Sequence, residues 1–151
     1  MSNFKGSEEH MLALSTFIKL IRSTNSVCND VHHHFLSELT VSQFGILEAL
    51  YHLGPMAQKE LATKILKSPG NITTIINNLE KNELVQRKVK SKDKRYYSIH
   101  LTPKGMSTIE RIFPIHADII LNRISVLTVS EQHTLGKLLK KLSLPSAEET
   151  I

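Results

Sequence analysis

The residues with the clearest chemical potential lie between Lys67 and Leu101, in the stretch KSPGNITTIINNLEKNELVQRKVKSKDKRYYSIHL. The first half carries Asn and Thr where an ordinary surface helix would carry Glu and Lys, and the second half is rich in Lys and Arg. Hydroxyl and amide groups can hydrogen-bond to base edges, while Lys and Arg neutralise phosphates. The combination favours a double-stranded nucleic acid as the partner of this stretch.

The polar half predicts a short helix that begins after Ser68, a natural N-cap, and runs from Pro69 to about Lys81. Exposed Asn and Thr cost roughly several tenths of a kcal/mol each relative to alanine, so we interpret them as functional rather than as an ordinary solvated face. The predicted buried stripe is Ile72, Ile75, Ile76 and Leu79, and the exposed arc is Gly70, Asn71, Thr73, Thr74, Asn77 and Asn78.

The charged half predicts two strands, 85–90 and 96–101, joined by a cationic tip. Like charges packed this closely repel one another, so contact with phosphates explains the set better than a solubilising loop does. Residues 54–102 hold ten Lys or Arg and four Asp or Glu, whereas the rest of the chain is slightly acidic. The cationic residues are Arg87, Lys88, Lys90, Lys92, Lys94 and Arg95, offset only by Asp93.

The elements that must position these residues are mainly helical. A short helix over about 58–66 and the polar helix, joined by a tight turn, form a predicted helix-turn-helix. We therefore expect one domain over residues 1–151, mainly α with a small β wing, in which 40–102 form a winged-helix lobe. The flanking helices, 8–38 and 103–143, are more apolar than a thin outer layer requires, so we expect them to form a homodimer. Such a dimer would present two polar helices to a pseudo-palindromic duplex, about one DNA turn or roughly 34–36 Å apart.

The order of these elements and several motifs resemble the MarR family of winged-helix transcription regulators. Any one motif is weak, but their order and spacing along about residues 10–143 make the resemblance specific. The matching segments are LTVSQFGILEAL, QKELATKIL, GNITTIINNLEKNELVQR, the Asp93-Lys94-Arg95 tip and the LTPKG that ends at Gly105. One departure is Glu83, where the family usually has glycine; because neighbouring Asn82 tolerates a left-handed conformation, we expect the turn to shift by one residue.

The resemblance implies a cytoplasmic homodimer that binds operator DNA and usually represses nearby genes. It implies that Arg95 enters the minor groove while Asp93 holds its guanidinium, and that the other wing cations contact phosphates. The residues that it places against bases or neighbouring phosphates are Ser68, Gly70, Asn71, Thr73, Thr74 and Asn77.

An effector pocket for small aromatic compounds is a further implication of the resemblance, with Tyr51, Phe113 and His116 as candidate lining residues. Ordinary core packing explains each of the three equally well. The sequence SPGNIT and the stretch from Ile112 to His116 are similar to a branch of the family linked to phenolic or quinone-like compounds.

Redox and metal sensing are the alternatives. Cys28 has Asp30 nearby and no Lys or Arg within four residues, so we expect a buried packing cysteine rather than a redox switch. The run from His32 to His34 cannot converge on one ion, because successive helical residues point about 100° apart, and we expect a surface run and no metal site.

Composition excludes several other classes. A single cysteine forbids an intrachain disulfide, and the chain has neither a secretory signal nor an apolar stretch of membrane-spanning length, so we expect a soluble cytoplasmic protein that uses no membrane. No nucleophile elbow, phosphate-binding glycine loop or paired metal-ligand motif is present, so we expect no enzyme, no catalytic residue and no cofactor. A winged-helix module that contacts protein or anionic lipid remains possible, but it would leave the Asn/Thr helix without a role.

Overall fold

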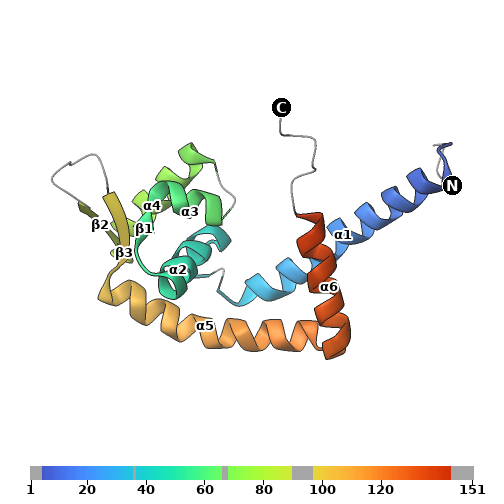
Figure 1. Ribbon diagram of the computed structural model, residues 1–151. Coiled ribbons are helices and arrows are strands. Elements are labelled where there is room, and N and C mark those ends of the chain that lie inside the picture. The colour runs from blue at the N-terminus through green and yellow to red at the C-terminus, as the bar shows by residue number, and fades with distance from the viewer. Residues whose placement is uncertain (1–4, 36, 66–67, 90–96, 144–151) are drawn as a thin grey trace.

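The protein consists of a lobe of short elements and a set of long helices that extend away from it (Figure 1). The computed structural model describes residues 5–35, 37–65, 68–89 and 97–143. The lobe contains α2 (Val41–Leu53), α3 (Gln58–Lys64), α4 (Pro69–Lys81) and a small sheet. The prediction of a mainly α fold with a small β wing is confirmed.

The sheet has three strands in the order β1-β3-β2, and both pairings are antiparallel. The two predicted strands are β2 (Val85–Val89) and β3 (Tyr97–Leu101), with Arg87 opposite Ile99. Sequence reading missed β1 (Met56–Ala57), because two residues are too few to show an alternating pattern. The pairing of β1 with β3 fixes the start of α3 against the wing.

The core of the lobe lies between α2, α4, the sheet and the first half of α5 (Pro103–Ile124). It contains the predicted stripe of α4, of which Ile72, Ile76 and Leu79 are almost fully buried. This leaves the opposite face of α4 exposed, and burial of three large aliphatic side chains on the order of 1.5–3 kcal/mol each holds that face in a fixed orientation. The other fully buried side chains are Phe35, Ile46, Leu47, Leu61, Val85, Ile99 and Ile109.

Local hydrogen bonds close two helix ends in the lobe, the start of α2 and the end of α4. At the start of α2, the Thr40 hydroxyl accepts from the Gln43 N–H while the Gln43 side chain accepts from the Thr40 N–H, which is the predicted capping box. At the end of α4, the N–H groups of Glu83 and Leu84 return to the carbonyls of Glu80 and Leu79. This pattern is a Schellman motif, in which the first residue past the cap is left-handed.

The left-handed residue at this exit is Glu83 itself, with φ of 61°. The expectation that Asn82 would take over this conformation is wrong, because Asn82 has φ of −86° and keeps the helix-cap position. The hydrogen-bonding pattern fixes which residue must be left-handed, and it does not move to suit the side chain. Glu83 therefore occupies a conformation that glycine adopts at lower cost.

The long helices are α1 (Glu8–His32), α5 and α6 (Val129–Leu142). α1 ends six residues before its predicted end, where a 3-10 turn (His33–Phe35) redirects the chain and buries Phe35 and Leu39 in the lobe. α5 continues through Pro114 as one helix. Within the described residues, no single helix is long and apolar enough to cross a membrane, and α5 with α6 would meet that criterion only as a pair bent by 100°.

Candidate nucleic-acid interface

The exposed face of α4 is the first part of the candidate interface. Ser68 occupies the N-cap position, yet its hydroxyl makes no capping hydrogen bond, and a Cβ at Gly70 would meet no atom within 4 Å. Asn71 and Thr74 are exposed on the same helix. Small and polar side chains at the N-terminal end of a helix leave its backbone N–H groups accessible to an anion. The predicted exposed arc of α4 thus lies on the surface of the described structure.

Thr73 connects the two helices of the helix-turn-helix. Its hydroxyl oxygen accepts a hydrogen bond of 2.7 Å from the side-chain amide of Gln58, the first residue of α3. The bond fixes how α3 crosses α4 at the surface, so Thr73 has a structural partner in addition to any ligand contact.

Asn77 and the wing are connected through Arg87 on β2. The Arg87 guanidinium donates to the Asn77 side-chain oxygen at 2.7 Å and forms a short ion pair with Glu80, which also accepts from the Arg87 backbone N–H at 3.2 Å. The Arg87 side chain is 23% exposed and Glu80 38%. We call Asn77, Glu80 and Arg87 the helix–wing clamp. It places Arg87 inside the protein's own network, whereas the sequence suggests a freely exposed cation.

The remaining wing residues divide into two groups. Lys88 is exposed on β2, and its contact with phosphates stays a prediction. Lys90, Lys92, Asp93, Lys94 and Arg95 lie outside the described residues, so the insertion of Arg95 into a minor groove stays a prediction.

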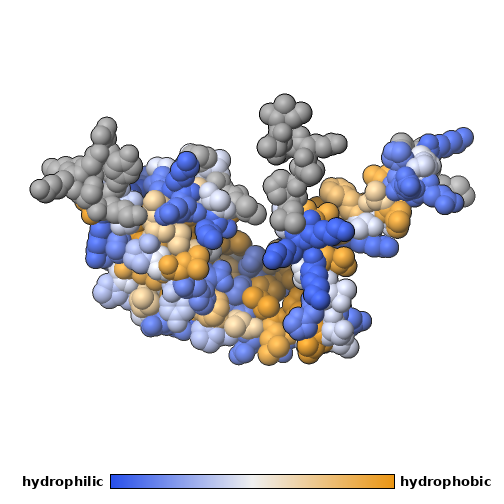
Figure 2. Space-filling model, viewed as in Figure 1, coloured by the Kyte–Doolittle hydropathy of each residue, from blue (hydrophilic) through white to orange (hydrophobic). Residues whose placement is uncertain are grey.

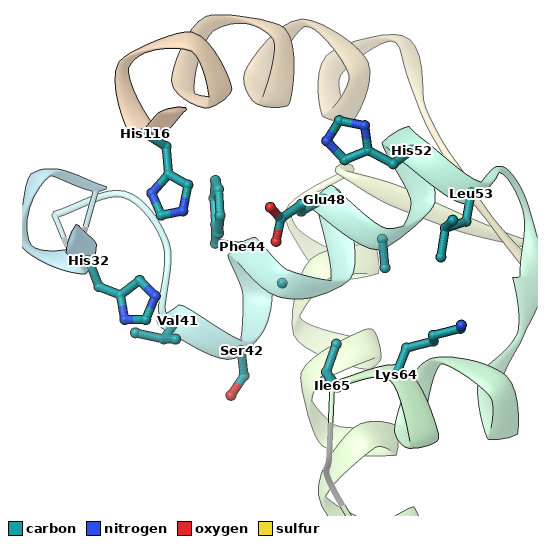
Figure 3. A pocket seen from close by; sticks show the side chains of 12 residues that line it. His32, Val41, Ser42, Phe44, Glu48, His52, Leu53, Lys64, Ile65 and His116 are labelled. Atoms are coloured by element: carbon teal, nitrogen blue, oxygen red, sulfur yellow. The ribbon is translucent and has the colours of Figure 1, made fainter. Parts of the chain in front are cut away.

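A second feature is a pocket of about 570 Å³ between α2, the C-terminal end of α1, the middle of α5 and the C-terminal end of α3 (Figure 3). His32 and His116 lie on one side, and His52, Leu53 and Lys64 on the other, with Phe44 and Glu48 between them. His116 is only 4% exposed, and no described residue is a hydrogen-bond partner of its Nδ1 atom. A buried polar atom without a partner is costly, and this cost disfavours charging the ring.

Two of the imidazoles that line this pocket, those of His116 and His32, have lowered pKa values that favour the uncharged form. Burial, followed by the nearby imidazoles of His34 and His32, lowers the pKa of His116 to about 4, and burial also lowers the pKa of His32. Burial raises the pKa of Glu48, partly offset by His52. A neutral imidazole offers one donor and one acceptor, so the site suits a ligand that hydrogen-bonds without carrying charge.

The sequence identified one lining residue of this pocket and missed most of the others. His116 lines it, whereas Tyr51 and Phe113 lie beside it and contact each other, with ring centroids 6.1 Å apart. His32, Glu48 and His52 line it without having been singled out for it. A signal was present in the unusual number of histidines, eight in 151 residues, but their convergence depends on the chain reversal after His32.

Two expectations about α1 and the turn after it are wrong. Cys28 is exposed in the protomer and not buried. In the histidine run only His33 is exposed. The His32 ring stacks on the His116 ring with centroids 5.9 Å apart, and the His34 ring centroid lies 5.3 Å from that of His116. In the part of the chain that the structure describes, no three His, Cys, Asp or Glu side chains are arranged to hold a metal ion.

A helix-turn-helix with a β wing and an exposed polar second helix defines the class of winged-helix DNA-binding transcription regulators. The MarR family model matches residues 39–97. The regulator MhqR of Bacillus subtilis is 35% identical over 133 residues, which cover 87% of this chain and 92% of MhqR. The chain therefore belongs to the MarR family of DNA-binding transcription regulators.

Solved structures show the same fold at lower identity. Sco3205 of Streptomyces coelicolor, a MarR regulator solved in complex with DNA, superposes with a TM-score of 0.80 at 21% identity, covering 98% of this chain and 94% of that one. BpsR of Bordetella bronchiseptica, whose DNA binding is regulated by 6-hydroxynicotinic acid, superposes with a TM-score of 0.77 at 22% identity, covering 86% and 99%. Both agree with a winged-helix lobe carried on long helices.

Proposed function

We propose that this protein is a homodimeric, cytoplasmic repressor that leaves its operator when a small hydroxylated aromatic compound binds. The observation that carries the effector part of the proposal is the 570 Å³ pocket, whose wall combines the imidazoles of His32 and His116 with the ring of Phe44. The DNA contacts that we propose are those named from the sequence on the exposed face of α4 and in the wing, except for Arg87, which is held by Asn77 and Glu80.

The long helices support the dimer. Large apolar side chains are exposed on all three, including Phe17 (60%), Leu121 (64%) and Leu138 (60%). Figure 2 shows this apolar surface on α1 and around α6, whereas much of the lobe is hydrophilic. A groove of about 1130 Å³ between α1, the end of α5 and α6 adds to it. Contiguous apolar surface of this kind is costly in water and is covered when a second copy supplies its own helices.

The chemistry of the pocket supports a phenol or hydroquinone as the effector. A phenolic hydroxyl can both donate and accept, which matches a neutral imidazole, and its ring can pack on Phe44 and the apolar pocket wall. The DNA binding of BpsR is regulated by 6-hydroxynicotinic acid, a hydroxylated aromatic ring that also carries a carboxylic acid group. A carboxylate ligand would meet two neutral histidines and Glu48, so we favour uncharged compounds.

The pocket is placed to couple binding to the spacing of the two lobes. Its wall includes His32 at the end of α1 and His116 on α5, and both helices lead away from the lobe toward the proposed dimer contacts (Figure 1). A ligand that fits one arrangement of these helices better than another shifts the population away from the spacing that operator DNA selects. The free energy of this population shift cannot exceed the difference in the ligand's binding free energy for the two arrangements.

The test combines oligomeric state with release from DNA. Analytical ultracentrifugation should show a dimer that Leu138→Glu dissociates. Leu53→Glu makes the same change at a similarly exposed leucine of the lobe and should leave the dimer intact. Hydroquinone should lower the affinity for a selected operator, measured by fluorescence anisotropy, and His116→Phe should abolish that effect without abolishing DNA binding. A monomeric wild type, or an operator affinity unchanged by phenol and hydroquinone, would contradict the corresponding part of the proposal.

A further inference from the structure

The helix–wing clamp determines which end of the Asn77 amide is available to a ligand. An amide side chain has an acceptor end and a donor end that are hard to tell apart by shape. The guanidinium of Arg87 has only donors, so the atom 2.7 Å from its Nη2 must be the Asn77 oxygen. The amide nitrogen of Asn77 is then the end that Arg87 does not hold, and it has no partner among the described residues.

Arg87 is itself fixed, so the orientation of Asn77 is not accidental. Glu80 lies one turn along α4 from Asn77, forms an ion pair with the guanidinium and accepts from the Arg87 backbone N–H at 3.2 Å. Two points of attachment hold Arg87 more rigidly than one contact would. The Glu80 carboxylate also offsets the charge of Arg87, which makes the group a poor phosphate ligand.

The surroundings of Asn77 on α4 permit close approach to a groove floor. Gly70, Thr73 and Thr74 precede it by seven, four and three residues, so helical periodicity places them on the same face. All three are small and exposed. A short side chain such as Asn reaches base edges only if its neighbours allow the helix to lie deep in the groove, and these neighbours do.

We propose that Asn77 reads a keto oxygen, the O6 of guanine or the O4 of thymine, in the major groove, and that Arg87 and Glu80 are positioning residues for it. At the position of this keto oxygen adenine and cytosine carry an amino group instead, and the N7 of adenine is the acceptor that remains on those two bases. A fixed N–H₂ group donates to the keto oxygen and opposes the amino group. The proposal rests on the DNA-binding role of the family and names the specificity of one position in the site.

The experiment uses the full-length protein and a duplex selected from a random library by binding. Each base pair of one half-site is replaced in turn, and affinity is measured by fluorescence anisotropy at two salt concentrations. We expect one position where wild type prefers guanine or thymine by about tenfold. Asn77→Ala should remove the preference at that position alone, and Asn77→Asp, which presents only acceptors, should shift it toward adenine or cytosine.

Arg87→Met tests the positioning role. This substitution lets the Asn77 amide rotate by 180° and present either end to the DNA. The preference for guanine or thymine at the same position should therefore fall to less than twofold, while the base preferences at other positions are unchanged. Lys88→Met is the matched control, since it removes the same charge from the next residue of β2, and it should weaken all duplexes alike and reduce the salt dependence by about one phosphate contact. If Arg87→Met behaves like Lys88→Met, or if Asn77→Ala weakens every duplex equally, the two residues contact phosphates and the proposal is overturned.

Discussion

The carbonyl oxygen of Leu84 lies where a side chain on Gly105 would begin, since a Cβ built at residue 105 would be 1.9 Å from that oxygen. The same carbonyl accepts the backbone N–H of Thr102 at 3.1 Å. The exit of α4 and the start of α5 are therefore in direct backbone contact. This explains the glycine of the LTPKG motif, because a side chain at this position would prevent the close approach of α4 to α5.

Gly105→Ala should destabilise the protein by about 3 kcal/mol, because backbone rather than a flexible side chain must move to admit the methyl group. Urea unfolding at a fixed protein concentration measures the change. Gly136→Ala is the control: no atom lies within 4 Å of a Cβ there, and a helical glycine replaced by alanine should gain about 0.5–1 kcal/mol. Equal stability of the two variants would mean that α4 and α5 are not packed this closely.

Glu83→Gly should stabilise the protein by about 1 kcal/mol, since an L-residue in the left-handed conformation costs about 1–2 kcal/mol and glycine avoids most of that cost. The pairing of Glu83 with Lys104 at 3.6 Å is exposed and its loss matters little. Asn82→Gly, at a residue with right-handed φ, should give no gain. Stabilisation by Asn82→Gly instead would show that the left-handed position is one residue earlier. Thermal and urea unfolding of the three proteins decide between the two positions.

The fold could be predicted from sequence wherever the evidence was local. Thr40, Ser68 and Thr102 were identified as N-caps from residues within three or four positions, and all three helices begin there, although the Ser68 hydroxyl makes no capping hydrogen bond. The apolar stripe of α4 has the same local character. Features that depend on distant contacts could not be predicted, such as β1, whose two residues form a strand only because β3 lies beside them.

The candidate site shows the same division. Exposure of Asn71 and Thr74 follows from helical periodicity alone. The helix–wing clamp does not follow from periodicity, because in the sequence Arg87 is one of several neighbouring cations. Only the packing of β2 against α4 brings it to Asn77 and Glu80. The pocket could not be predicted either, because it depends on the turn after α1, which directs His32 and His34 back toward His116. Sequence spacing alone gave no reason to group these three histidines.

Gly70→Ala separates a structural from a functional role for this glycine. A Cβ there meets open space in the protein, so alanine should raise the free energy of unfolding by about half a kcal/mol. If the N-terminal end of α4 lies against the DNA backbone, the same methyl group should lower operator affinity, by about tenfold for a lost contact of this kind. Urea unfolding and fluorescence anisotropy measure the two effects. A more stable variant with wild-type affinity would place the DNA backbone away from Gly70.

His116 should make stability sensitive to mild acid. Its pKa is about 4 in the folded protein and near 6.5 when unfolded, so between these values the unfolded chain binds the additional proton. The free energy of unfolding should therefore be fully retained above about pH 6.5 and fall as the pH drops toward 4. The loss attributable to this residue is on the order of 2 kcal/mol.

Removing the imidazole isolates that contribution. His116→Phe keeps an aromatic ring beside Phe44, whose ring centroid lies 4.5 Å from that of His116, but it cannot take up a proton. The fall in unfolding free energy between pH 7 and pH 4.5 should shrink in this variant, because no imidazole remains at position 116 to bind a proton when the chain unfolds. His33→Phe, at the exposed residue of the run, should keep the wild-type pH profile. Identical profiles for His116→Phe and wild type would mean that acid acts through other groups, and that the imidazole at 116 is not held neutral by burial.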